Sequence, residues 1–330
     1  MYDFTNFKGV IIMSRQNPTV IIALGGNALS PKNESGNINE QFAHTRDSLN
    51  AMMFFIENRY NICITHGNGP QVGAELLKNE ITKNQIPSLP LGVLVANTQG
   101  AIGYMIQQTL QNELQKHDID REVVTFISQV IVDQNDSTIK NPTKFIGKTY
   151  DDSEAKKLSK DLGWNIKEQE KNVWRRVVAS PKPKYIFNGN SVKHLVDFGT
   201  IVVAGGGGGI PAYVDDNGLL NGLDAVIDKD MSAALLGRII KAEELFIITD
   251  VDQVCLNYKL DNEVKIKNAK INELQNWIDD GQFGEGTMLP KIHAAQYFLD
   301  HHGQKVVITS LEKIKEAING KAGTIITKGK

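Results

Sequence analysis

One stretch of the chain reads Ile201-Val202-Val203-Ala204-Gly205-Gly206-Gly207-Gly208-Gly209, a short β-branched run followed by five consecutive glycines. The apolar run predicts a buried strand, and the glycines predict a turn of bare backbone at its carboxyl end. Such a backbone can approach a phosphate closely and direct its N–H groups at the oxygens. Farther along, Val226–Asp230 places Lys229 between Asp228 and Asp230. A lysine flanked by carboxylates suits phosphoryl transfer, which depends on positioning and on neutralising charge.

Similar β-branched runs recur along the chain and alternate with longer helical patterns. A helical pattern covers roughly residues 38–58, between the first two strands. The predicted strands besides residues 201–204 are 19–24, 61–65, 122–126, 245–249 and 305–309. This alternation predicts an α/β fold with a mainly parallel sheet covered by helices. Ligands of such folds bind at the carboxyl ends of the strands, which is where the glycine run falls.

Length and composition are those of an ordinary globular protein. The chain has 330 residues, of which 41% are hydrophobic and 22% charged, and its formal net charge is −2. The length allows one large domain or two. The near-neutral charge predicts no nucleic-acid or membrane partner, and no apolar run reaches the roughly 20 residues that a spanning helix needs. Cys63 and Cys255 lie in apolar runs and are predicted to be buried thiols, which favours a reducing, cytoplasmic location. Residues 1–16 are interpreted as an N-terminal extension, with disorder as one alternative.

Two further glycine turns follow the first two predicted strands. They are Gly25-Gly26-Asn27 after residues 19–24 and Gly67-Asn68-Gly69 after residues 61–65. Each offers backbone donors for anionic oxygens where a helix begins, although each could also be a tight turn and nothing more. Because neighbouring parallel strands bring their carboxyl ends together, three glycine turns at one edge favour an anion site. His66, beside the second turn, stays open between a functional and a structural role.

Other motifs are weaker or argue against particular sites. The glycine run does not match the G-x-G-x-x-G pattern of dinucleotide folds, so an NAD oxidoreductase has little support. No spacing of cysteine and histidine suggests a zinc site. The segment 98–104 places glycines in a helical pattern, which favours close helix packing or a subunit interface. Pro290 suits the first turn of a helix, where Lys291 would face a ligand or the solvent.

Residues 134–200 interrupt the alternation of strands and helices. The segment from Asp136 to Gly163 is polar, and the prolines Pro142, Pro181 and Pro183 punctuate the region. We interpret residues of about 134–185 as an inserted subdomain that protrudes over the site as a lid. An irregular surface excursion is the alternative.

Taken together, these segments resemble the amino acid kinase family, and within it the carbamate kinases. The resemblance covers about residues 18–328. The glycine turns and the Ile-Asp-Lys-Asp motif resemble the wider family, whereas Asn141–Lys144 and Ser180–Pro183 resemble the carbamate kinases in particular. The segments that carry the resemblance are residues 23–28, 66–73, 98–100, 141–144, 174–178, 180–183, 206–211, 225–230 and 288–291.

The resemblance implies a three-layer α/β sandwich with a mainly parallel central sheet and a protruding lid. It divides the chain into a lobe for carbamate and carbamoyl phosphate, residues 17–200, and a nucleotide-binding lobe, residues 201–330. The implied activity is reversible phosphoryl transfer between carbamoyl phosphate and ADP, giving ATP and carbamate, as in fermentative arginine degradation by the arginine deiminase pathway. A cytoplasmic homodimer is implied as well, with Mg²⁺ held through the nucleotide phosphates and by no protein ligand directly.

The resemblance also assigns site residues. Lys229 would bridge donor and acceptor oxygens, Asp228 would orient Lys229, and Lys144 would reach down from the lid. The predicted phosphate- and carbamate-binding residues are Gly25, Gly26, Asn27, Gly67, Asn68 and Gly69. The predicted nucleotide-binding residues are Gly206, Gly207, Asp230, Met288 and Lys291.

Three departures from the family pattern bear on activity. Phe145 replaces a proline, Lys148 follows Gly147 where proline or arginine is usual, and Lys171-Asn172-Val173 replaces a run that contains glycines and an arginine. They leave open the alternative that the chain is a catalytically weakened nucleotide-binding homologue. Another amino acid kinase, acting on acetylglutamate, glutamate or a nucleoside monophosphate, is the second alternative and would need a roomier acceptor pocket.

Overall fold

The computed structural model describes residues 17–26, residue 29 and residues 36–329. The predicted N-terminal extension, residues 1–16, and the predicted site residue Asn27 lie outside the described residues. No helix in the described part of the chain is long and apolar enough to cross a membrane.

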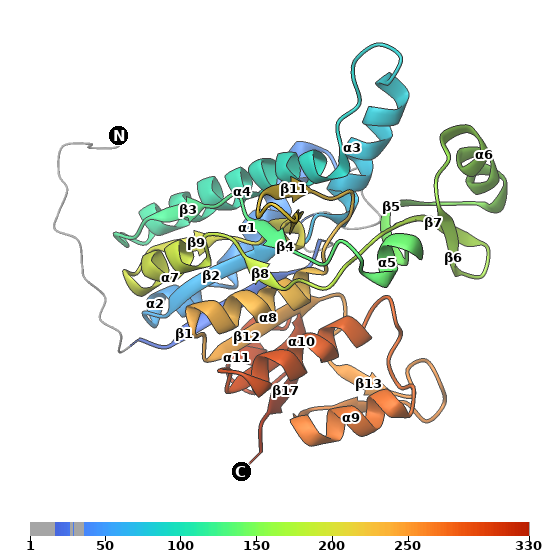
Figure 1. Ribbon diagram of the computed structural model, residues 1–330. Coiled ribbons are helices and arrows are strands. Elements are labelled where there is room, and N and C mark those ends of the chain that lie inside the picture. The colour runs from blue at the N-terminus through green and yellow to red at the C-terminus, as the bar shows by residue number, and fades with distance from the viewer. Residues whose placement is uncertain (1–16, 27–28, 30–35, 330) are drawn as a thin grey trace, which may run out of the picture.

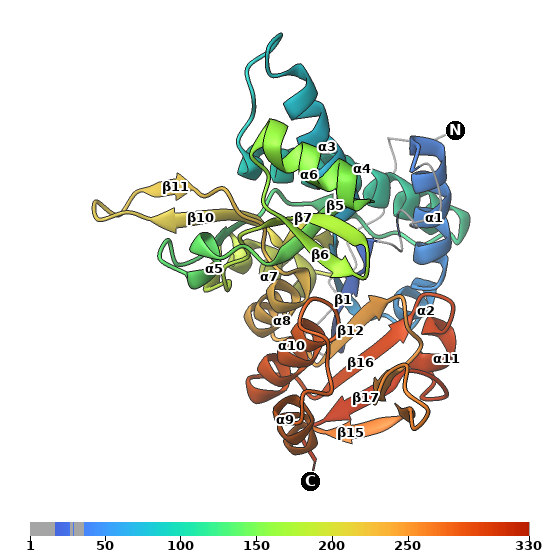
Figure 2. The ribbon, with the colours of Figure 1, turned by 90° about the vertical axis from the view of Figure 1, so that its right-hand side faces the viewer.

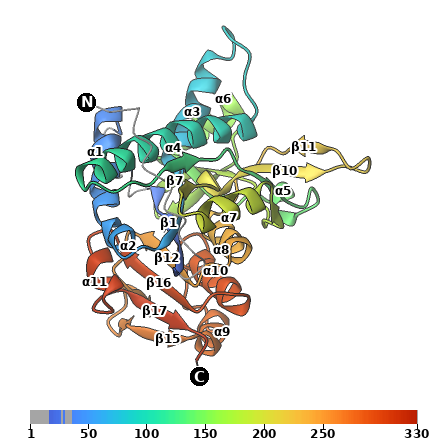
Figure 3. The same cartoon turned by 90° about the vertical axis from the view of Figure 1, so that its left-hand side faces the viewer.

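A continuous eight-stranded sheet forms the centre of the molecule (Figure 1). Its strands are β1 (Thr19–Leu24), β2 (Asn61–His66), β3 (Val123–Thr125), β9 (Ile201–Val203), β12 (Glu244–Thr249), β15 (Asn268–Lys270), β16 (Lys305–Ser310) and β17 (Thr324–Thr327). They lie in the order β15-β17-β16-β12-β1-β2-β9-β3. The six strands from β16 to β3 are parallel, whereas β17 is antiparallel to β16 (Figure 3). All six strands predicted from the sequence belong to this parallel part, so the predicted α/β class is confirmed.

Helices cover both faces of the sheet and make it the middle of three layers. Along β1, Val20, Ile22 and Leu24 are buried in one core, and Ile21 and Ala23 in the other, as the alternation of a strand requires. The first core is covered by α1 (Ile38–Asn50), α2 (Met53–Glu57), α4 (Leu91–Lys116) and α11 (Ile314–Ile318). The second is covered by α7 (Gly189–Asp197), α8 (Lys229–Ile240), α9 (Ile271–Asp279) and α10 (Leu289–Asp300). The helical pattern predicted over residues 38–58 is therefore two helices, α1 and α2.

Smaller sheets are attached to this body. One has the strand order β11-β10-β4-β8 and contains β4 (Gln129–Ile131), β8 (Tyr185–Ile186), β10 (Ile210–Val214) and β11 (Leu220–Gly222). The hairpin of β10 and β11 projects far from the body (Figure 2). A second hairpin pairs β13 (Val254–Leu256) with β14 (Val264–Ile266). The short 3₁₀ helix η2 (Gly206–Gly208) lies within the glycine run, directly before β10.

The inserted segment folds into a unit of its own, which we call the protruding subdomain, residues 137–178. Its three-stranded antiparallel sheet has the order β5-β7-β6 and it stands beside α3 (Gly69–Thr82) (Figures 1 and 2). Its elements are α5 (Ser137–Lys140), β5 (Lys144–Tyr150), α6 (Asp152–Leu162), β6 (Ile166–Glu170) and β7 (Val173–Val178). Tyr150, Ala155 and Trp164 form a small core inside it. The segment therefore has a regular fold with a small core, and the alternative of an irregular surface excursion is wrong.

Strands from both predicted lobes share the one central sheet. β1, β2 and β3 come from residues 17–200, β9, β12 and β16 come from residues 201–330, and β9 lies between β2 and β3. The division into residues 17–200 and 201–330 by ligand stays a prediction.

Candidate active site

The first two glycine turns meet at the carboxyl edge of the sheet. β1 and β2 pair in register from Thr19 with Asn61 to Leu24 with His66, and the Gly67 amide donates to the Leu24 carbonyl at 2.9 Å. A Cβ at Gly67 would lie 2.8 Å from the backbone nitrogen of Gly26, closer than real Cβ contacts allow. Only glycine fits there, because the two turns pack backbone against backbone. The predicted meeting of the Gly25-Gly26 and Gly67-Asn68-Gly69 turns is thus observed.

The five-glycine run is wedged between the second turn and the segment that precedes Asp228. A Cβ at Gly206 would lie 2.3 Å from Nε2 of His66, and one at Gly207 would lie 2.3 Å from Nδ2 of Asn68. On the other side, a Cβ at Gly208 would lie 2.2 Å from the carbonyl oxygen of Ile227. Gly207 and Gly208 also have φ of 65° and 88°, which side chains other than glycine rarely adopt. Every position of the run therefore requires glycine, Gly206 because of its close contact with His66 and the other four because their φ angles are positive.

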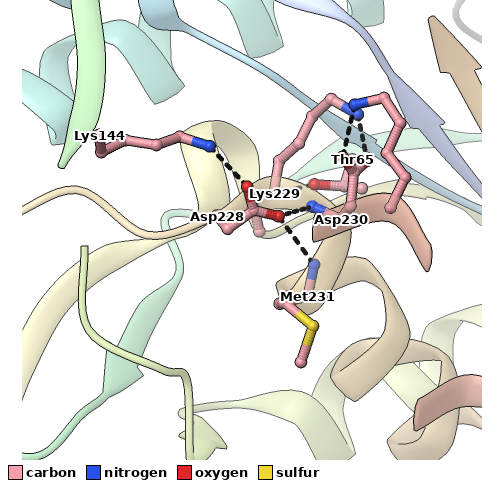
Figure 4. Close-up of polar contacts among 8 residues, drawn as sticks. Thr65, Lys144, Asp228, Lys229, Asp230 and Met231 are labelled. Carbon is pink, nitrogen blue, oxygen red and sulfur yellow. Dashed lines mark hydrogen bonds and ion pairs between the residues drawn. The ribbon is translucent and has the colours of Figure 1, made fainter. Parts of the chain in front are cut away.

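Asp228 begins helix α8. One of its carboxylate oxygens, Oδ1, accepts the amides of Asp230 at 2.9 Å and Met231 at 3.2 Å, as an N-cap residue does. The other, Oδ2, accepts Nζ of Lys144 at 2.6 Å, so the protruding subdomain reaches the body here (Figure 4). Burial by itself would raise the pKa of Asp228. The charge and hydrogen bond of Lys144 outweigh it and hold the pKa of Asp228 below its ordinary value.

Asp230 holds two lysines from different helices. Its Oδ1 pairs with Nζ of Lys229 at 2.5 Å, and its Oδ2 pairs with Nζ of Lys291 at 3.0 Å, 61 residues away at the start of α10. Burial opposes the charge of Asp230, but the two lysines overcome it, so the pKa of Asp230 lies well below its ordinary value. Burial likewise lowers the pKa of Lys229 against the attraction of Asp230. For Lys291, Asp230 and Asp228 overcome burial and raise the pKa.

The arrangement differs from the prediction in one respect. The sequence analysis assigned the orientation of Lys229 to Asp228, and in the structure Asp230 takes that place. Asp228 is engaged by the helix N-terminus and by Lys144. With three lysines and two aspartates, the cluster of Lys144, Lys229, Lys291, Asp228 and Asp230 has one excess positive charge. An anionic ligand can therefore be attracted to it without further counter-charge.

His66 is buried in this packing. Its ring is 1% exposed, and Nδ1 lies 3.0 Å from the carbonyl oxygen of Gly67. Burial lowers the pKa of His66 to about 4, so its imidazole is neutral at neutral pH. Gly206 packs close to the other ring nitrogen, so the packing favours the structural one of the two roles that the sequence left open for His66.

The remaining predicted residues are placed as follows. Met288 is the residue before α10 and packs, partly buried, against the core below that helix, whereas Lys291 points to Asp230. Among the residues that the sequence analysis missed are Thr65 and Ser232, whose hydroxyls donate to the carbonyls of Gly205 at 2.8 Å and Gly208 at 2.6 Å. Single hydroxyl residues in a strand and a helix carry no recognisable signal in a sequence.

The three departures from the family pattern all lie in the protruding subdomain or at its edge. Phe145 lies beside Gly286, whose Cβ would be 3.7 Å from the Phe145 ring. Lys148 pairs with Glu154 at 3.5 Å, within the subdomain. Lys171 and Asn172 form the exposed turn between β6 and β7, with φ of 62° at Asn172, and Val173 already belongs to β7. The turn uses asparagine at the one left-handed position, which asparagine tolerates better than most residues.

Comparison with known proteins agrees with this geometry. The sequence pattern of the amino acid kinase family matches residues 18–310. A carbamate kinase of Pyrococcus horikoshii is 44% identical over 93% of this chain and 98% of its own, and one of Clostridium perfringens is 42% identical over 94% and 99%. The structure of carbamate kinase from Giardia lamblia bound to AMP-PNP superposes with a TM-score of 0.85 at 37% identity, covering 95% of this chain and 99% of that one. This chain therefore belongs to the amino acid kinase family, and within it to the carbamate kinases.

Proposed function

We propose that the chain transfers a phosphoryl group reversibly between carbamoyl phosphate and ADP. In the forward direction the bond from phosphorus to the carbamoyl oxygen breaks, a β-phosphate oxygen of ADP takes the phosphoryl group, and carbamate leaves. The observation that carries the proposal is the buried set Lys229–Asp230–Lys291 beside three glycine turns. Such a set offers cations and bare backbone where charge moves in the reaction.

The roles follow the positions of the side chains. Lys229 lies along Gly67, because a Cβ at Gly67 would be 3.4 Å from Cδ of Lys229. Lys229 therefore lies between the glycine run and the turn Gly67-Asn68-Gly69, which we call the acceptor turn because we expect it to hold carbamate. We assign to Lys229 the role of neutralising the negative charge that builds up on the transferred phosphoryl group. The turns Gly25-Gly26 and Gly67-Asn68-Gly69 would hold that group and carbamate, while Gly206, Gly207 and Lys291 would face the nucleotide phosphates. Asp230 orients Lys229 and Lys291 in this scheme, and Met288 and Asn27 keep their predicted binding roles.

No general base is needed in this scheme. Carbamate is already anionic, as is the β-phosphate of ADP, so neither has to lose a proton before attack. His66, buried and neutral, is not required as one. Lys144 would contribute a second positive charge from the subdomain. To do so, it would leave its ion pair with Asp228 and pair with the anionic substrate.

The residues fit Mg²⁺ held by the nucleotide. No group of three or more metal-binding side chains occurs in the described part of the chain, and both aspartates of the site are already paired with lysines. Mg²⁺ bound to nucleotide phosphates would neutralise part of their charge.

The protruding subdomain would act as a lid in this reaction. It touches the body through Lys144, through Gly147, which packs on Gly73 of α3, and through Ile146 and Val178, which are buried against α3 and α4. We expect amide exchange in residues 144–178 to slow when ADP and a carbamoyl-phosphate analogue bind together. Equal exchange in both states would leave the subdomain a fixed part of the surface.

The resemblance also predicts a homodimer, the arginine deiminase pathway and a cytoplasmic location. For the dimer, α4 offers an open surface at Gly100, where a Cβ would meet nothing within 4 Å, next to Tyr104, which is 56% exposed. Sedimentation of the full chain tests the dimer directly.

A coupled assay for ATP tests the proposed reaction. Purified protein is given ADP and carbamoyl phosphate, and ATP is followed by hexokinase and glucose-6-phosphate dehydrogenase. The Lys229→Ala variant, purified in the same way, is the control for contaminating kinases. ATP from the parent chain alone supports the proposal, and acetylglutamate or a nucleoside monophosphate used with ATP as alternative acceptors should give no turnover.

A catalytically weakened homologue is the second candidate, favoured by the replaced run Lys171-Asn172-Val173. Binding of ADP in calorimetry without ATP formation in the assay would select it.

A further inference from the structure

We propose that Gln99 of α4 is a positioning residue of the transfer reaction, fixing the glycine run against the acceptor turn. The inference rests on the proposed function, because the reaction defines what the two turns must align. No hydrogen bond joins Gln99 to Lys229 in the described structure, and its bond to the predicted nucleotide-binding turn goes to a backbone carbonyl. It would act through the backbone of Gly206.

The side-chain amide of Gln99 forms hydrogen bonds with two segments of the chain. Its Nε2 donates to the carbonyl of Gly206 at 2.8 Å and to the carbonyl of Ser128 at 3.2 Å, and its Oε1 accepts the Ser128 amide at 2.9 Å. The side chain is 1% exposed. Ser128 in turn accepts the Gly205 amide with its hydroxyl at 2.9 Å. Gln99 therefore ties the glycine run to the segment before β4 through a closed ring of bonds.

The neighbouring residue on the same helix holds the other turn. Thr98 Oγ1 accepts Nδ2 of Asn68 at 2.9 Å, and a Cβ at Gly207 would lie 2.3 Å from that same Nδ2. Two adjacent residues of α4 thus bind one turn each, Thr98 the acceptor turn and Gln99 the glycine run. Because helix backbone is rigid over one residue, this pair sets the distance between the two turns.

The distance between the turns matters because in-line transfer requires donor and acceptor oxygens at fixed positions. Misplacement by about 1 Å can cost about 100-fold in rate. Thr65 and Ser232 fix Gly205 and Gly208, but Gln99 alone among the described side chains is bonded to Gly206, which faces His66 of the acceptor strand. Loss of Gln99 should therefore leave substrates bound and lower the rate of transfer.

Two variants test this. In Gln99→Met the size is kept and all polar contacts are lost, and we expect kcat to fall about 100-fold while KM for ADP changes little. In Gln99→Glu the introduced carboxylate would face the carbonyls of Gly206 and Ser128, and only its protonated form can donate to them. Burial raises the pKa of such a carboxyl. We therefore expect the activity of Gln99→Glu, relative to the parent chain, to rise as the pH is lowered from 8.5 to 6.

Thr109→Val is the matched control, since Thr109 is a buried polar residue ten positions farther along α4. It should lower the melting temperature without changing kcat. A Gln99→Met kcat close to that of the parent, with the fold intact by circular dichroism, would overturn the inference. So would a Gln99→Glu pH profile parallel to that of the parent, and this second variant decides if Gln99→Met does not fold.

Failure of the proposed function would look different. If the parent chain makes no ATP, the proposed reaction is wrong whatever Gln99 does. Amide exchange of peptides over residues 205–209 in the unliganded protein then tests whether the hydrogen bonds of Gln99 hold the glycine run in place. Faster exchange in Gln99→Met than in Thr109→Val supports it, and equal exchange in the two rejects it.

Discussion

Two regions of the molecule bury positive charge in opposite ways. One is the protruding subdomain, and the other is the edge of the sheet with Lys229, Lys291 and Asp230, which we call the catalytic edge after the proposed function. At the edge, Lys229 and Lys291 each meet Asp230 within 3.0 Å. In the subdomain, Nε of Arg175, Nη1 of Arg176 and Nε1 of Trp174 are buried without a hydrogen-bond partner in the described structure. Arg176 instead stacks on Trp164, 4.4 Å from the ring centroid. Burial lowers the pKa of both arginines.

The difference indicates how each region is fixed. The catalytic edge can adopt only one arrangement, because every shift would break an ion pair or a close backbone contact between turns that have no room for a Cβ. The subdomain has a small core of its own. It is joined to the body through the ion pair of Lys144, the packing of Gly147 on Gly73, and Ile146 and Val178, which are buried against α3 and α4. Buried polar groups without partners are what a region that moves on ligand binding can tolerate. The predictions below test this contrast.

The largest effect is expected from Lys229→Ala, at the centre of the paired region. Charge that develops only in the transition state would lose its partner, so kcat should fall about 10³-fold while ADP still binds. Steady-state kinetics and calorimetry with ADP measure the two quantities. Lys78→Ala, which removes an exposed lysine paired with Glu75, is the control and should change neither. A loss of less than tenfold would remove Lys229 from the assigned role.

Lys144→Met tests the contact between the two regions. Removing a cation that reaches the site from the subdomain should lower kcat about 100-fold, comparable to the loss of one stabilising donor. KM for carbamoyl phosphate should rise as well, whereas KM for ADP should not. If only the ion pair with Asp228 matters, Lys144→Arg will have the full activity of the parent chain. If Lys144 acts on the substrate as a point charge, Lys144→Arg will have only part of that activity.

Gly73→Ala separates the subdomain from α3. The added Cβ would lie 2.0 Å from Cα of Gly147, so helix and strand must move apart, at a cost of about 2 kcal/mol. We expect faster amide exchange in residues 144–178 and unchanged exchange in the central sheet. Gly92→Ala is the control, because its Cβ would meet only ordinary contacts at 3.7 Å. Faster exchange throughout the chain would contradict independent attachment of the subdomain.

Acid should weaken the catalytic edge through His66. Its pKa is about 4 in the folded protein, against an ordinary value of about 6.5, so the unfolded chain binds the proton more readily. The stability that neutral His66 contributes is complete above pH 6.5 and is lost progressively between pH 6.5 and 4. The loss should be about 1 kcal/mol at pH 5.5.

Urea unfolding of the parent chain and His66→Asn at pH 7.5 and 5.5 measures this contribution. The difference in stability between the two chains should shrink at the lower pH. The protruding subdomain contains no histidine, so its local exchange should show no matching step. A difference that does not depend on pH would mean that the pKa of His66 is the same in the folded and the unfolded chain.

The sequence by itself determined the layers of the fold and the place of the site. Six β-branched runs, several of which end in glycine or small polar residues, were enough, because parallel strands must align and their carboxyl ends must then share one edge. It also named Asp228, Lys229, Asp230 and Lys291 as candidate site residues, and the structure brings them together. Only the tertiary structure decided which aspartate holds Lys229. Lys291, 61 residues away from Asp230, comes from another helix, and the N-terminus of α8 occupies Asp228.

The same limit applies to Gln99 and Gly73. Nothing in their neighbourhoods in the chain shows that one is bonded to Gly206 and the other is packed on Gly147. Both contacts join segments more than 70 residues apart, so no local pattern records them. Local propensity and hydrophobic period fix elements and their order. Which side chains and backbones then meet is set by close packing of the whole chain, where a single Cβ or a single amide decides whether two segments fit.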